Sequence, residues 1–217
     1  MQALLGQEPA IEAGDALPPF FQQIYFWNPQ VPEQLGRDGH PKTGGIIPDM
    51  GLPRRMWAGG RLEIGRPLLA GTPARRLTFV DRTSRKNGRS GPLGFVTLRH
   101  EFWQSDDLCV TEWQDLVYRQ DPGTAAQPDP PSARDDEDFR EMVSFSTTAL
   151  FRYSALTFNG HRIHYDIVYA KEVEGYGGLV VHGPLLAQSL MLLAERRAAA
   201  GELLVPRHIC ADAFRNG

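Results

Sequence analysis

Four consecutive segments of alternating apolar and polar residues constrain the fold of this chain more than any other feature. They span residues 56–68, 74–86, 91–103 and 108–119, and each is enriched in β-branched or aromatic side chains. This period and composition are typical of half-buried β-strands. Turn-forming residues separate the segments, at 70–73, 86–88 and 104–107. The sequence therefore predicts an antiparallel meander of about four strands.

The side-chain period of a strand predicts the two faces of the third segment. Phe95, Thr97 and Arg99 should share one face, and the other face should carry Val96, Leu98 and His100. Before the strands, residues 17–27 predict a short helix with several aromatic side chains. Residues 28–54 are rich in Pro and Gly and indicate an irregular crossing.

A Pro- and Asp-rich segment, residues 121–141, divides the chain. Such a segment cannot bury apolar surface and is typical of a linker. We therefore expect an N-terminal domain over residues 1–120 and a C-terminal segment over residues 142–217. In that segment, residues 143–157 predict a short strand or turn, and residues 164–174 predict a short helix.

Residues 180–199 predict a long helix, because Pro184 stands near its start and Gly201 just after its end. Its residues 185–194 are apolar on nearly every side, so a sheet or a second subunit should cover them. The few residues after this helix do not predict several further strands.

The composition excludes several classes of protein. The chain has 217 residues and a net charge of −3, which argues against a dedicated nucleic-acid-binding protein. The longest apolar stretch is too short to span a membrane, and the first residues do not resemble a signal peptide. The two cysteines, Cys109 and Cys210, form no disulfide or zinc motif. We expect a cytoplasmic protein that does not enter a membrane.

The charge is nevertheless unevenly distributed. Residues 54–89 contain ten Lys or Arg but only two acidic residues, Glu63 and Asp81. This basic stretch, which ends at Arg89, could bind phosphate groups of a ligand, although a solvated basic face explains it about as well.

The densest group of polar side chains lies in residues 158–184. It contains three of the six histidines, an amide and a carboxylate: His161, His164, His182, Asn159 and Asp166. Histidine is the side chain best suited to proton transfer near neutral pH. At the start of the predicted short helix, His164 should be neutral, because the helix dipole disfavours a positive charge there. Surface or capping roles are an equally good interpretation of these histidines.

Two other interpretations involve the same region. His161 and His164, with His182 or Asp166, could bind a metal, but the spacing matches no strong zinc signature, so we predict no metal. Gly183, at the start of the long helix, could present a backbone N–H to a carbonyl oxygen or oxyanion. An ordinary helix start after a Gly-rich loop is the alternative.

The run N-G-H-R-I-H-Y-D, followed by G-G-L-V-V-H-G-P and an apolar helix, resembles the MaoC-like hotdog-fold dehydratases. Their signature is G-D-x-N-P-[IVL]-H-x-D, and Ile163, His164 and Asp166 match its last part. Asn159 stands where the family has a catalytic Asp. The runs R-R-M-W-A-G-G-R-L and T-E-W-Q-D-L-V-Y-R are similar to a double-hotdog subgroup with mesaconyl-C4-CoA hydratases and type 2 3-hydroxyacyl-thioester dehydratases. The resemblance covers about residues 15–195.

The resemblance implies an α+β double hotdog, in which curved antiparallel sheets wrap long helices and the C-terminal half is incomplete. It implies a hydro-lyase for an α,β-unsaturated or 3-hydroxy acyl thioester. His164 would be the principal acid–base residue, Asn159 would orient water, and Gly183 would bind the thioester carbonyl through its N–H. The expected substrate-binding residues are His161, Asp166, His182 and Arg89.

The same resemblance implies the partners and the alternatives. The partner would be an acyl-CoA or acyl-carrier thioester, with coenzyme A present only as part of the substrate and no other cofactor. A homodimer or a larger assembly is expected, because hotdog sheets commonly pair edge to edge. The alternatives are a non-catalytic thioester-binding or dimer-forming hotdog protein and a metal-dependent hydrolase.

Overall fold

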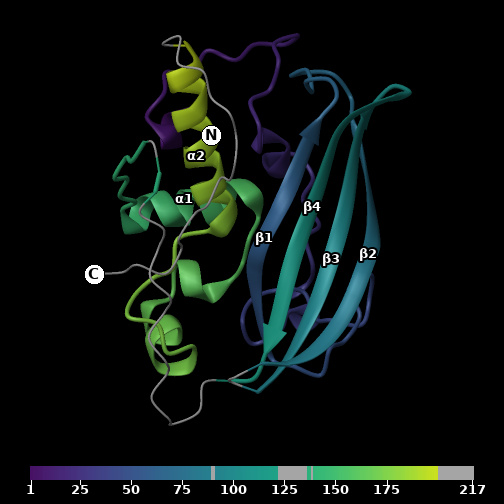
Figure 1. The fold of residues 1–217 in the computed structure, drawn as a ribbon, viewed down its shortest axis with the longest axis vertical. Helices are drawn as coiled ribbons and strands as arrows, with labels where there is room; N and C mark the ends of the chain where they lie inside the picture. The colour runs from purple at the N-terminus through teal and green to yellow at the C-terminus, as the bar shows by residue number, and fades with distance from the viewer. Residues whose placement is uncertain (89–90, 122–135, 138, 200–217) are drawn as a thin grey trace.

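The computed structural model describes residues 1–88, 91–121, 136–137 and 139–199. A long antiparallel sheet forms one side of the molecule, and the helices lie beyond one of its edges (Figure 1). The strands are β1 (Arg54–Ile64), β2 (Arg75–Gly88), β3 (Gly91–Gln104) and β4 (Asp107–Arg119). They match the four predicted segments, and the predicted α+β class is confirmed.

The predicted meander is only partly correct. Strands β2, β3 and β4 follow one another across the sheet, but β1 pairs with β4, which gives the order β1-β4-β3-β2. The connection from β1 to β2, residues 65–74, contains Pro67 and Pro73, which cannot donate hydrogen bonds to a neighbouring strand. The chain therefore leaves the sheet after β1 instead of turning directly into β2.

The predicted faces of β3 are confirmed. Val96, Leu98 and His100 are buried, whereas Phe95, Thr97 and Arg99 are only partly buried. The buried face packs with Leu116 and Tyr118 of β4 and with side chains of the N-terminal segment, namely Met50, Ile47 and Leu52. A second cluster contains Leu68, Phe102, Cys109 and Val110, covered by Leu17 and Phe26.

The predicted helix over residues 17–27 is wrong. Only a 3-10 helix, Phe21–Ile24, is present. Two prolines precede it, and Phe20 has a left-handed backbone with φ of 68°, which a regular helix does not accommodate. The segment is held by contacts with the sheet instead, as in the tilted contact between the Phe26 and Phe102 rings at 5.2 Å.

The C-terminal part also differs from the prediction. Helix α1 (Thr147–Thr157) replaces the predicted strand or turn. Ser146 begins it, because its Oγ accepts a hydrogen bond from the Ala149 N–H at 3.2 Å. The predicted helix over residues 164–174 is a 3-10 helix, Arg162–His164, followed by a π-helix, Tyr169–Val173.

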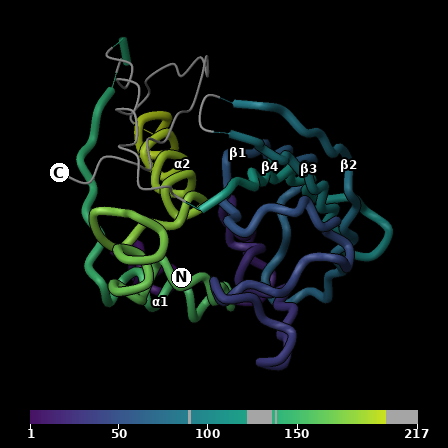
Figure 2. The backbone as a smooth tube through the Cα atoms, turned by 90° about the horizontal axis from the view of Figure 1, so that it is seen from below, coloured from purple at the N-terminus to yellow at the C-terminus, as the bar shows by residue number. Residues whose placement is uncertain are grey.

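The long helix is present as α2 (Gly183–Ala199), with Pro184 as its second residue. It lies beside β1 and does not cross the face of the sheet (Figures 1 and 2). The fully buried Leu185 packs against Leu150 and Tyr153 of α1. All strands among the described residues lie within positions 54–119, so in this part of the chain no sheet wraps α2.

Several predictions lie outside the described residues. They concern the residues after the long helix, at 200–217, most of the proposed linker and Arg89. Within the described ranges, no helix could serve as an apolar span across a bilayer.

A buried ion pair joins β1 to the C-terminal part. Arg54 Nε binds Glu174 Oε2, and Arg54 Nη2 donates to the Glu174 backbone carbonyl at 2.8 Å. Both side chains are almost fully buried, and the Tyr169 hydroxyl donates to the other oxygen of Glu174 at 3.1 Å. Because a buried charge without its partner is costly, this pair fixes the C-terminal part against the sheet.

We predict that Glu174→Gln lowers the free energy of unfolding by about 3–5 kcal/mol, because it leaves the Arg54 charge buried and unpaired. Urea denaturation followed by circular dichroism measures this change. Asp107→Asn is the matched control, since Asp107 pairs with Arg66 in an exposed ion pair at 2.6 Å. The control should cost at most about 1 kcal/mol. Equal effects of the two variants would contradict the prediction.

Candidate active site

A cavity of about 390 Å³ lies between the sheet and the C-terminal part. The N-terminal segment, the strands and the segment before α2 all contribute to its wall. The wall includes the side chains of His40, Arg55, Arg76, His100, Glu112, Asn159, His161, His164, His182 and Trp57. The cavity thus joins the predicted histidine group to residues that the motif does not contain.

His164 is buried in this wall, at the last position of the 3-10 helix Arg162–His164. It does not begin a helix, so the dipole argument from the sequence is wrong. Burial instead lowers the pKa of His164 to about 4. Its Nδ1 lies 2.7 Å from the Val180 carbonyl oxygen, so Nδ1 carries the hydrogen. Nε2 can then accept a hydrogen bond, and none of the described residues donates one to it.

The structure brings the other two histidines of the motif to His164. The His182 ring stacks on the His164 ring at 3.6 Å between centroids, and His161 meets the His164 ring edge-on at 5.3 Å. Ser154 Oγ lies 2.8 Å from His182 Nε2. Burial, together with the nearby histidines, lowers the pKa of both His161 and His182 to about 2. All three imidazoles are therefore neutral at pH 7.

Asn159 also lines the cavity, but its side chain has a local role. The Asn159 Oδ1 accepts a hydrogen bond from the His161 N–H at 3.0 Å. The bond shapes the turn that leads from α1 into the 3-10 helix.

Asp166 lies apart from the cavity wall. It accepts hydrogen bonds from the Tyr169 N–H at 3.0 Å and from Arg162 Nη2 at 2.7 Å. These contacts hold the backbone that follows the motif.

Gly183 lies where the sequence predicted, at the first position of α2 and in the cavity wall. A Cβ atom at this position would lie 2.2 Å from Cε3 of Trp57 in β1. The absence of a side chain lets the helix start approach the sheet. The first N–H groups of a helix have no partner within the helix, so the Gly183 N–H can serve a ligand.

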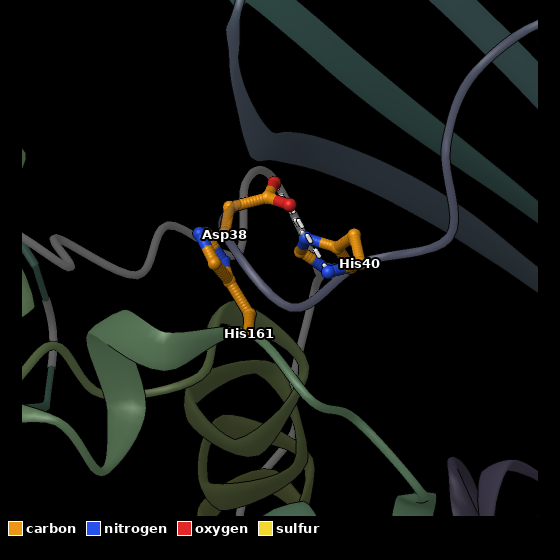
Figure 3. Close-up of side chains that lie close together, drawn as sticks. All are labelled: Asp38, His40 and His161. Carbon is orange, nitrogen blue, oxygen red and sulfur yellow. Dashed lines mark hydrogen bonds and ion pairs between the residues drawn. The ribbon is translucent and has the colours of Figure 1, made fainter. Parts of the chain in front are cut away.

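Asp38 and His40, in the N-terminal segment, form a pair that the sequence did not predict (Figure 3). Asp38 Oδ2 lies 3.1 Å from His40 Nδ1, and Asp38 Oδ1 accepts from the His40 N–H at 3.0 Å. The His40 ring lies 4.3 Å from the His161 ring. The only local signal was the Asp-x-His spacing inside a stretch interpreted as an irregular crossing.

These side chains are also the ones that could bind a metal. Asp38, His40 and His161 each offer a ligand atom, and these atoms all lie within 4.8 Å of one another. This set shares only His161 with the alternative considered from the sequence, which was His161 and His164 with His182 or Asp166. That the chain needs no metal stays a prediction, which elemental analysis can test.

The predicted basic stretch does not form one patch. Arg54 is buried in an ion pair, and Arg61 stacks over the Trp113 ring at 3.8 Å. Two other members, Arg55 and Arg76, line the cavity. Among the described residues, no carboxylate lies within ion-pair distance of either one, so both guanidinium groups can meet an anionic ligand.

Known proteins with similar sequences indicate the family of this chain. A family model described as hydroxyacyl-thioester dehydratase type 2 matches residues 21–208. The chain is 47% identical over 189 residues to a mesaconyl-C(4)-CoA hydratase of Chloroflexus aurantiacus, a match that covers 86% of this chain and 67% of that protein. It is 26% identical to the mitochondrial hydroxyacyl-thioester dehydratase type 2 of Saccharomyces cerevisiae, with 78% of this chain and 63% of the yeast protein covered.

A crystal structure of a MaoC-like dehydratase from Phytophthora capsici has a TM-score of 0.50 with this chain at 17% identity, covering 72% of this chain and 56% of that one. This likeness supports the hotdog fold. The chain spans about two thirds of the length of the two curated relatives.

We predict that the protein loses stability as the pH falls from about 6.5 to about 4. The ordinary histidine pKa of 6.5 applies to the unfolded chain, and burial lowers the pKa of His164 to about 4 in the folded chain. The unfolded state therefore binds more protons in this window. Each such buried histidine should lower the free energy of unfolding by roughly 1–3 kcal/mol when the pH reaches about 4.

Urea denaturation at a series of pH values measures this loss. His161→Gln should make the loss smaller, because the variant removes one of the buried histidines that resist protonation. A denaturation midpoint that is constant between pH 7 and about 4.5 would contradict the prediction.

Proposed function

Because the chain belongs to the family of type 2 hydroxyacyl-thioester dehydratases, which are hydro-lyases, we propose that it adds water to an α,β-unsaturated acyl thioester or removes it from a 3-hydroxyacyl thioester. The observation that carries this proposal is the state of His164. Its imidazole is neutral, and Val180 fixes the tautomer at 2.7 Å. His164 lines the same cavity as Gly183.

His164 performs the proton transfer in this mechanism. In hydration, its Nε2 takes one proton from water while the water oxygen bonds to the β-carbon of the acyl chain. The electron pair of the double bond moves through the α-carbon toward the thioester carbonyl. The imidazolium of His164 then returns its proton to the α-carbon, so the net change is the addition of one water. Dehydration follows the same steps in reverse.

Gly183 stabilises the negative charge that develops on the thioester oxygen. Its N–H lies at the start of α2, where the helix dipole favours a negative charge. The close packing of Gly183 on Trp57 fixes this N–H relative to the sheet.

Asn159 cannot accept a proton at neutral pH, because an amide is not a base. Its hydrogen bond to the His161 N–H gives it a positioning role.

We propose an unsaturated dicarboxylic acyl chain, such as that of mesaconyl-C4-CoA, as the substrate. The relative at 47% identity is named for this substrate. Arg55 and Arg76 provide two cationic groups in the cavity wall for the free carboxylate of such a chain. Coenzyme A enters as part of the substrate, and the proposed chemistry needs no other cofactor.

The assembly and the cellular location are parts of the same proposal. Strand β2 is an edge of the sheet, and it exposes Leu77, Phe79 and Val80. An exposed apolar edge favours pairing with a second copy, so we propose a homodimer or a larger assembly. Cys109 is a free thiol, which agrees with the reducing conditions of the cytoplasm.

We predict that His164→Ala lowers kcat by about 10²–10⁴-fold, because general acid–base catalysis typically contributes that much. Asn159→Asp should keep most of the kcat with monocarboxylic enoyl-CoA substrates, since a carboxylate can still accept the His161 N–H. Asn159→Ala should cost less than the loss of His164, because it removes only a positioning hydrogen bond. The loss of the enoyl-CoA absorbance measures turnover, for several acyl chains including branched dicarboxylic ones.

Circular dichroism should confirm that each variant is folded. Lys171→Ala, an exposed change in the same part of the chain, serves as the control and should leave kcat unchanged. Full activity of His164→Ala would overturn the assignment. No turnover of any substrate by the unmutated chain would favour a non-catalytic thioester-binding protein.

We predict that Arg55→Met raises KM for dicarboxylic enoyl-CoA substrates at least tenfold but changes KM for a monocarboxylic enoyl-CoA much less. The guanidinium can form a charge-assisted pair only with the free carboxylate, and such a pair contributes about 1.5–3 kcal/mol. Arg66→Met, which removes an exposed arginine outside the cavity wall, is the matched control. An equal rise in KM for both substrate types would contradict a role in carboxylate recognition.

A further inference from the structure

The proposed hydration calls for an acceptor for the second hydrogen of the attacking water. His164 offers a single acceptor, Nε2, because its Nδ1 donates to Val180. The carbonyl oxygen of Asn159 already accepts the His161 N–H at 3.0 Å. A water held by one group can rotate, and a second acceptor in the cavity wall would fix its direction of attack.

The loop at residues 36–40 is joined directly to the motif that contains His164. The Asp38 carbonyl oxygen accepts from the Arg162 N–H at 2.9 Å, and the Arg37 carbonyl oxygen accepts from Arg162 Nη1 at 3.1 Å. A Cβ atom on Gly39 would lie 2.0 Å from the Gly160 carbonyl oxygen. The two backbones thus touch without intervening side chains, and the loop has a fixed place beside the motif.

The hydrogen bond inside this loop fixes the tautomer of His40. An ionised carboxylate only accepts hydrogen bonds, so His40 Nδ1 must carry the hydrogen that faces Asp38. The other oxygen of the Asp38 carboxylate accepts the His40 backbone N–H at 3.0 Å, so both oxygens act as acceptors. His40 Nε2 is therefore an acceptor, and it has no hydrogen-bond partner among the described residues.

His40 shares the cavity wall with His164. The rings of both residues contact the His161 ring, with centroid distances of 4.3 Å for His40 and 5.3 Å for His164.

We infer that His40 is a second catalytic histidine and that its Nε2 accepts the other O–H of the water that His164 deprotonates. This inference rests on the proposed function. The O–H bond that faces His40 is not broken, and its hydrogen remains on the hydroxyl group of the product. Asp38 is a positioning residue, because it acts through His40 by fixing the tautomer. The loop thereby provides a further acceptor, apart from the Asn159 oxygen, one lone pair of which already accepts the His161 N–H.

The test compares three variants of the full chain with the enoyl-CoA assay. Asp38→Asn places an amide at His40 Nδ1, which can donate to it and so favour the tautomer with hydrogen on Nε2. It should lower kcat about 10²–10⁴-fold, as expected when a catalytic histidine has the wrong tautomer. His40→Phe should lower kcat about 10²-fold or more. His40→Gln retains an acceptor oxygen and should remain within about tenfold of the parent, with KM nearly unchanged in all three.

A second measurement does not depend on activity. Long-range 1H–15N NMR spectra of the histidine rings should show hydrogen on Nδ1 of His40 in the parent and on Nε2 in Asp38→Asn. A merely structural role of Asp38 would not couple this change of tautomer to kcat. If the unmutated chain were inactive, the proposed function would be overturned. The NMR spectra would still show whether Asp38 fixes the tautomer of His40. An active parent whose kcat is unaffected in Asp38→Asn and His40→Phe would overturn the inference.

A metal arm completes the test. Treatment with EDTA should leave kcat and the NMR tautomer unchanged. Loss of activity with EDTA and recovery on addition of Zn²⁺ would show that Asp38, His40 and His161 bind a metal, and would overturn the role of His40 as a hydrogen-bond acceptor.

Discussion

The cavity of the candidate active site depends on one close contact between two backbones. A Cβ on Gly39 would lie 2.0 Å from the Gly160 carbonyl oxygen, and a Cβ on Gly160 would lie 2.7 Å from the Gly39 carbonyl oxygen. Gly39 also has a φ of 85°, a conformation that other residues rarely adopt. Only glycine at both positions lets the N-terminal loop reach the histidine motif. The ion pair of Arg54 and Glu174 then fixes the same two parts at β1.

This arrangement keeps a group of neutral imidazoles together. The His161 and His182 rings both contact the His164 ring, and the His40 ring contacts the His161 ring. Removal from water disfavours the charged form of each ring, and a charge on one ring disfavours a charge on the next. The neutral state follows from this packing and needs no helix dipole. Because these imidazole rings are neutral, they can accept protons at pH 7.

The sequence predicted the parts of the fold that local patterns determine. The four strands and the faces of β3 follow from a period of two, and the start of α2 follows from Gly183 and Pro184. The position of β1 beside β4 could not be predicted, because it depends on pairing between distant segments. The helix predicted over residues 17–27 is absent, because contacts with the sheet outweigh a weak local preference. Helix α1 was missed, because the capping role of Ser146 was not recognised.

The same division applies to the site. His161, His164, His182, Asn159 and Gly183 were found because one continuous motif contains them. Asp38 and His40 were missed because they come to the cavity through backbone contacts that no local pattern encodes. Their Asp-x-His spacing is common, and it gains meaning only beside a second histidine group. From the sequence, residues 54–89 were treated as one basic stretch. In the structure Arg54 is buried in an ion pair, whereas its neighbour Arg55 lines the cavity.

An amide in the slot of the family's carboxylate agrees with a dicarboxylic substrate. A carboxylate at Asn159 would repel the free carboxylate of such a substrate by about 3 kcal/mol at 5 Å and an effective dielectric constant of 20. A neutral His40 avoids this repulsion, and the Asp38 charge is bound to the far side of its ring. Glu112 does line the cavity, but the side-chain amides of Gln22, Gln23 and Gln114 donate to its carboxylate. The neutral His40 can therefore accept a hydrogen bond from the attacking water, while Arg55 remains available to the carboxylate of the substrate.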